Sequence, residues 1–64
     1  MEDLRKYLKP VRKALKLKQQ EFAKLLGVSN VTLSYWEHGR LGMGLKNQKQ
    51  FIEFCKSRGI KINY

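Results

Sequence analysis

Apolar residues recur every three or four positions over the first fifteen residues of the chain. They are Leu4, Tyr7, Leu8, Val11 and Leu15. This spacing is typical of one face of an amphipathic helix, and Asp3 stands where such a helix takes its N-cap. Pro10 lies inside the stripe, where a proline removes a backbone donor and clashes with the preceding turn. We therefore predict a first helix that is either kinked at Pro10 or broken, with Pro10 opening a second piece.

The next helical segment is predicted over residues 19–26. Its inward positions are Phe22, Ala23 and Leu26. Gly27 follows where the chain must leave the helix in a left-handed conformation. Lys18 stands at the N-cap, where Ser or Thr is favoured. The start of this helix is therefore weakly capped by its own sequence, and a bound phosphate could satisfy the amides there.

A third helix is predicted from Ser29 to Glu37. Ser29 is its expected N-cap, and Leu33 and Trp36, three residues apart, form its inward pair. Gly39 is expected to close this helix. Spacings of three and four residues place the remaining side chains on a different, exposed face. That face carries Asn30, Val31, Ser34 and Tyr35.

The C-terminal part of the chain is predicted to be an irregular connection over 39–46, followed by a fourth helix. Asn47 is its expected N-cap, with Gln50 at the third helical position of a capping-box variant. Its inward face is Phe51, Ile52, Phe54 and Cys55. Gly59 is expected to stop the helix, and the alternation over 60–64 would suit a short strand. The fold predicted is all-α: a small bundle of four helices with a short C-terminal extended tail.

The length of the chain, 64 residues, limits it to a single domain over residues 1–64. So small a core leaves no room for the deep, walled pocket of an enzyme. Cys55 and His38 are the only cysteine and histidine. We expect a small core residue and a surface residue, because neither has partners at ligand or catalytic spacing. We therefore expect no disulfide, metal or cofactor, and, with no apolar run of membrane length, a cytoplasmic protein.

The charge of the chain is strongly positive but unevenly distributed. Fourteen Lys and Arg against five Asp and Glu give a net charge of +9, which favours a polyanionic partner. Residues 1–18 carry seven basic and two acidic groups, residues 19–38 one and two, and residues 39–64 six and one. The near-neutral middle block suits base recognition, because base edges need neutral hydrogen-bonding and apolar groups whereas phosphates need cations.

That middle block, residues 19–38, carries the pattern of a helix-turn-helix. Two short helices meet at a sharp angle when a small residue lies at their approach, a glycine makes the turn and apolar residues fill the wedge. Ala23 and Gly27 meet the first two demands. The wedge is Phe22, Leu26, Val28, Leu33 and Trp36. From about Leu8 to Gly59, and most clearly over residues 14–39, the sequence resembles the lambda-repressor and Cro-like helix-turn-helix family, also called the XRE type.

The resemblance implies that the first helix of the motif crosses the DNA backbone and the second lies in the major groove. It places Asn30, Val31 and Tyr35 where side chains reach base edges. Asn can bond N6 and N7 of adenine, and Val can pack on a thymine methyl. Tyr35 can bond a base or a phosphate through its hydroxyl. The alternative is that Asn30 is a plain first-turn residue and Tyr35 a partly buried aromatic.

Other residues are candidates for contact with the DNA backbone. They are Lys18, Gln19, Ser29, Thr32, Ser34 and Arg40. Gln19 matches the phosphate-contacting glutamine of the family, and Arg40 could reach a phosphate or the minor groove, or simply be solvated. Glu37 matches a family position that pairs with an arginine of the first helix, here Arg12; the alternative is a solvated charge.

The function implied is that of a sequence-specific transcriptional regulator. We expect a repressor that binds double-stranded DNA as a homodimer on a palindromic operator, without a small-molecule ligand or a membrane. The alternative is a protein-interaction adaptor or antitoxin-like module, in which Tyr35, Trp36 and the C-terminal apolar residues would contact protein. RNA binding is a third possibility, but the chain lacks a stacked-aromatic platform. An enzyme is not expected, since no catalytic constellation is visible.

Overall fold

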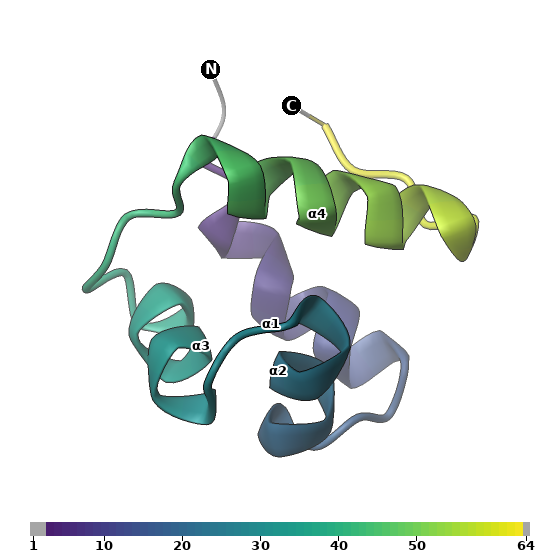
Figure 1. Ribbon diagram of the computed structural model, residues 1–64. Helices are drawn as coiled ribbons and strands as arrows, with labels where there is room; N and C mark the ends of the chain where they lie inside the picture. The colour runs from purple at the N-terminus through teal and green to yellow at the C-terminus, as the bar shows by residue number, and fades with distance from the viewer. Residues whose placement is uncertain (1–2, 64) are drawn as a thin grey trace.

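The computed structural model describes residues 3–63 and shows four α-helices (Figure 1). They are α1 (Arg5–Ala14), α2 (Gln19–Leu26), α3 (Asn30–Glu37) and α4 (Leu45–Ser57). Helices α2 and α3 pack against each other, α1 packs on α3, and α4 packs on α2. Residues 3–63 contain no strand, so the predicted all-α bundle is confirmed. Within the same range, no helix is long and apolar enough to cross a membrane.

One apolar core joins all four helices and accounts for their amphipathic patterns. Its buried members are Leu4, Leu8, Val11, Phe22, Ala23, Leu26, Leu33, Trp36, Met43, Phe51, Phe54 and Cys55. At the centre, the Phe22 ring meets Phe51 and Phe54 edge to face, with centroids 6.4 and 5.4 Å apart. This geometry is favoured by aromatic quadrupoles. The inward positions predicted for the four helices therefore all contribute to the core, with Tyr7, Leu15 and Ile52 partly buried at its edge.

Helix α1 differs from its prediction at Pro10 and at its N-terminus. The helix runs through Pro10 without interruption, so a break with a second piece starting there is wrong. Pro10 lies on the exposed face, where water can replace a missing backbone bond. Leu4, not Asp3, is the flanking residue at the start. The Asp3 carboxylate nevertheless accepts a hydrogen bond from the Arg5 backbone N–H at 3.0 Å, as a cap would.

The end of each helix in the described residues is closed by one residue with positive φ. These are Lys16 (58°), Gly27 (74°), Gly39 (70°) and Gly59 (68°). At Gly27, for example, the N–H of Val28 donates to the Ala23 carbonyl and the N–H of Gly27 donates to the Lys24 carbonyl. These are the two hydrogen bonds of a Schellman motif. The three glycines were predicted to end helices. Lys16 was missed, because a lysine in this conformation carries no signal in its residue type.

Helix α4 begins at Leu45, with Gly44 as the flanking residue, so the prediction that Asn47 is the N-cap is wrong. The reason lies in the preceding loop. Met43 is buried in the core, and the Gln48 side chain donates a hydrogen bond to its carbonyl at 2.8 Å. Burial of Met43 brings the chain into the helical path earlier than the capping pattern indicated. The extended tail carries Ile60 and Ile62, which pack against the core without forming a strand.

Candidate nucleic-acid interface

The start of α3 is organised by a side-chain cap at the position predicted from the sequence. The Ser29 Oγ accepts a hydrogen bond from the Thr32 backbone N–H at 3.1 Å. The same hydroxyl donates to the Thr32 Oγ1 at 2.9 Å. Capping of this kind stabilises a helix by about 1 kcal/mol. Two candidate backbone contacts, Ser29 and Thr32, thus lie together at the first turn, where free amides and the positive end of the helix dipole attract anions.

The two faces of α3 separate as its spacing predicts. Leu33 and Trp36 are fully buried. Val31 and Tyr35 are 60% and 48% exposed, which leaves them available to a partner. Two further candidates complete this outer face: Asn30 is exposed and Ser34 is half-buried. The structure therefore brings the three predicted base-contacting residues, Asn30, Val31 and Tyr35, onto one accessible surface together with Ser34. We call these four residues the α3 outer face.

Helix α2 begins next to this surface and is better capped than its sequence suggested. Lys18 offers no side-chain acceptor, but its backbone N–H donates to the Glu21 carboxylate at 2.8 Å. This is one half of a capping box, supplied from the third helical position. Glu21 was missed because Lys18 does not complete the usual pair. The positive end of the helix dipole also stabilises the carboxylate of Glu21 in the first turn. Lys18 remains exposed at the helix start.

A partly buried ion pair connects α1 to the end of α3. The Arg12 guanidinium meets the Glu37 carboxylate through two bonds, Nε to Oε2 at 2.9 Å and Nη2 to Oε1 at 3.1 Å. The side chains are only 15% and 3% exposed. The Gln19 amide donates to the same carboxylate at 3.3 Å, and Arg12 also reaches the Leu17 carbonyl at 3.4 Å. Glu37 thus joins the first helix and both helices of the motif at one point.

The loop after α3 holds the last candidate contact, Arg40. Its side chain is exposed, and its backbone N–H donates to the Tyr35 carbonyl at 2.8 Å. The loop is tied to α1 because the Arg5 guanidinium donates to the Leu41 carbonyl at 2.9 Å. Arg5 also pairs with Asp3 at 2.7 Å, and this hydrogen bonding lowers the pKa of the Asp3 carboxyl to about 2. Sequence reasoning missed Arg5, because a contact across 36 residues has no local signature.

Comparison with known proteins agrees with this geometry. No curated protein and no solved structure matches the chain. A family model described as helix-turn-helix matches residues 8–42, which is more than half of the chain. The match covers α1 from Leu8 onward, the motif and the part of the following loop that carries Arg40. Within residues 3–63 there is also no group of His, Cys, Asp and Glu that could hold a metal ion. The match over residues 8–42 shows that the chain belongs to the helix-turn-helix family of the lambda-repressor and XRE type, a DNA-binding regulatory domain.

Proposed function

We propose that the protein is a transcriptional repressor that binds a palindromic operator as a homodimer, with α3 in the major groove. The observation that carries this proposal is the α3 outer face. It presents an amide, a small apolar group and a phenol side by side, and these are groups that match base edges. In this proposal Asn30, Val31 and Tyr35 contact bases.

The proposed contacts to phosphate come from Ser34 within that face and from residues outside it. Lys18 and Gln19 at the start of α2, Ser29, Thr32 and Ser34 on or beside α3, and Arg40 in the following loop are the proposed backbone contacts. Exposed cations at two of these positions flank a reading helix that itself carries no cation. That division supports the proposal, because cations hold the protein on any duplex whereas neutral groups discriminate between sequences.

The size of the reading helix supports binding as a pair. Eight helical residues span about 12 Å, so one copy reaches only a few base pairs. Two copies related by a two-fold axis would place their helices in successive major grooves, roughly 34 Å apart. A palindrome with half-sites one helical turn apart is therefore the expected operator. Occupancy of such a site would repress transcription by covering it.

Selection of bound sequences from random duplex DNA tests the proposal directly. We expect enrichment of one sequence with two-fold symmetry and a spacing of about ten base pairs between half-site centres. Binding titrations against protein concentration then give the number of copies on the duplex. Salt-sensitive binding without any enriched sequence would contradict the proposed function.

The reading residues are tested by Asn30→Ala. Its loss should weaken operator binding by about 1–3 kcal/mol and leave binding to a scrambled duplex nearly unchanged, because an adenine contact matters only where the adenine is present. Asn47→Ala, a change of the same residue type inside α4, is the matched control and should affect neither duplex. An equal loss on both duplexes for Asn30→Ala would show that α3 does not read bases.

The phosphate contacts are tested by Arg40→Ala. This change should weaken binding to operator and scrambled duplex alike and lower the slope of log K against log salt by about one ion. Arg58→Ala is the matched control, because it removes an arginine at the C-terminal end of α4, whereas Arg40 lies in the loop that precedes this helix. Titrations at several salt concentrations separate the two. An unchanged slope for Arg40→Ala, or an equal change for Arg58→Ala, would exclude Arg40 from the interface.

A further inference from the structure

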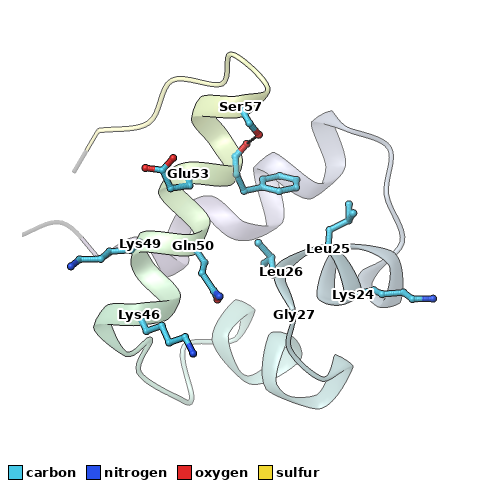
Figure 2. A pocket seen from close by; sticks show the side chains of 10 residues that line it. Lys24, Leu25, Leu26, Gly27, Lys46, Lys49, Gln50, Glu53 and Ser57 are labelled. Carbon is cyan, nitrogen blue, oxygen red and sulfur yellow. Dashed lines mark hydrogen bonds between the residues drawn. The ribbon is translucent and has the colours of Figure 1, made fainter.

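A groove with an apolar floor runs between the C-terminal half of α2 and helix α4 (Figure 2). Its volume is about 730 Å³. Leu25, Leu26 and Phe54 form the floor, and Leu25 is 51% exposed. The Phe54 ring is held in place by its edge-to-face contact with Phe22. Leu26 and Phe54 are buried, so the accessible apolar surface of the groove is centred on Leu25.

The rim of this groove is positively charged. Lys24 lines it from α2, and Lys46 and Lys49 line it from α4, against a single acid, Glu53. None of the three lysines has an ion-pair partner among residues 3–63. In Figure 2, Lys46 and Gln50 extend from α4 toward the α2 side, whereas Lys49 and Glu53 extend from its outer edge. Lys24 extends from α2 away from α4 in the same view, so Lys46 is the cation that reaches toward the apolar floor.

We propose that the groove between α2 and α4 docks an acidic amphipathic segment of a partner protein. Leucine or aromatic side chains of that segment lie on Leu25, beside the edge of Phe54, and its carboxylates meet Lys46. Charge complementarity selects this occupant. A second copy that docked through the same groove would set its own lysines against these, so like charges would face one another. Duplex DNA matches the lysines, but its phosphates gain nothing from an apolar floor.

The groove is separate from the proposed DNA interface. None of the residues that line it is among the proposed base or phosphate contacts. A partner could therefore bind while the protein occupies its operator, and the two activities can be measured independently. The proposal does not rest on the proposed function: a protein that fails to read DNA could still bind an acidic segment here.

The test is selection from a library of random linear peptides against the full chain. We expect enriched peptides that combine Asp or Glu with Leu, Phe or Trp. Fluorescence anisotropy of an enriched peptide should show binding at least about fivefold weaker for Leu25→Ser and for Lys46→Glu. Leu41→Ser and Lys13→Glu, an exposed leucine and an exposed cation outside the groove, are the matched controls and should bind normally. Thermal melts establish that each variant is folded.

Four results would overturn the proposal, the last of them from NMR. The first is the absence of enriched peptides, or enrichment of peptides without acidic residues. The second is equal binding of an enriched peptide to groove variants and controls. The third concerns the other class of partner: if Lys46→Glu weakens binding to scrambled duplex DNA as much as Arg40→Ala does, the lysines serve DNA instead. NMR chemical-shift changes confined to the groove residues would support the proposed site, and changes on the α3 outer face would contradict it.

Discussion

The ion pair between Arg12 and Glu37 makes a sharp prediction about stability. The variant Glu37→Ala removes a carboxylate that is 3% exposed and that accepts hydrogen bonds from Arg12 and Gln19. The Arg12 guanidinium, 15% exposed, would keep only a long bond of 3.4 Å to the Leu17 carbonyl. A buried charge left without its counter-ion is the situation in which loss of one partner is most costly.

The expected loss follows from these contacts. Removing one member of a buried pair typically costs about 3–5 kcal/mol, and partial access of Arg12 to water lowers this to about 2–4 kcal/mol. A domain of this size has a total stability of roughly 3–10 kcal/mol. Glu37→Ala should therefore remove a large share of the free energy of unfolding. Glu53→Ala, on the exposed side of α4, is the control and should change it by less than about 0.5 kcal/mol.

Urea unfolding followed by the fluorescence of Trp36 provides the assay, because this buried residue is the only tryptophan. A double-mutant cycle with Arg12→Met isolates the pair. Removing both charges should cost less than the sum of the two single changes, since the uncompensated charge then disappears. Additive losses, or a loss for Glu37→Ala no larger than that for Glu53→Ala, would refute this account of the pair.

Three further predictions concern titration, reactivity and the turn. The Asp3 carboxyl should titrate near pH 2 by NMR, and its pKa should return toward 3.8 in Arg5→Ala. Because the folded state lowers this pKa, the contribution of Asp3 to stability is present above pH 3.8 and is lost as the pH falls through 2. The Cys55 thiol, whose pKa is raised by burial, should react with a thiol reagent at least about 100-fold more slowly than in urea. Gly27→Ala should cost about 1–2 kcal/mol in urea unfolding, because φ is +74° and no clash contributes, whereas Gly42→Ala should cost nothing.

Several features were predictable because their causes are local. The inward faces of the helices follow from a period of 3.6 residues, so Leu33 and Trp36 were placed correctly from spacing alone. The Ser29 cap and the left-handed Gly27 each depend on neighbours within a few residues. The candidate base-contacting residues could be selected by the same reasoning, because the exposed side chains of α3 are those that its buried face leaves over.

The errors share a different physical origin. Helix α4 starts at Leu45 because Met43, two residues earlier, is drawn into the core, which residues distant in the chain build. Lys16 takes a left-handed conformation because the chain must turn there to bring α2 onto α3, although nothing in its residue type favours it. A capping pattern such as Asn47 with Gln50 has a value of about 1 kcal/mol, which burial of one large apolar side chain exceeds.

Periodicity, turn glycines and charge distribution were enough to define the helices, the motif and a polyanionic partner, since each acts over one or two turns of the chain. The family resemblance had indicated the pair of Arg12 with Glu37. Packing alone added Gln19 to that pair and tied Arg5 to the Leu41 carbonyl. It also created the charged groove between α2 and α4. These features join residues far apart in the chain, and their geometry exists only after the core has set the distances between the helices.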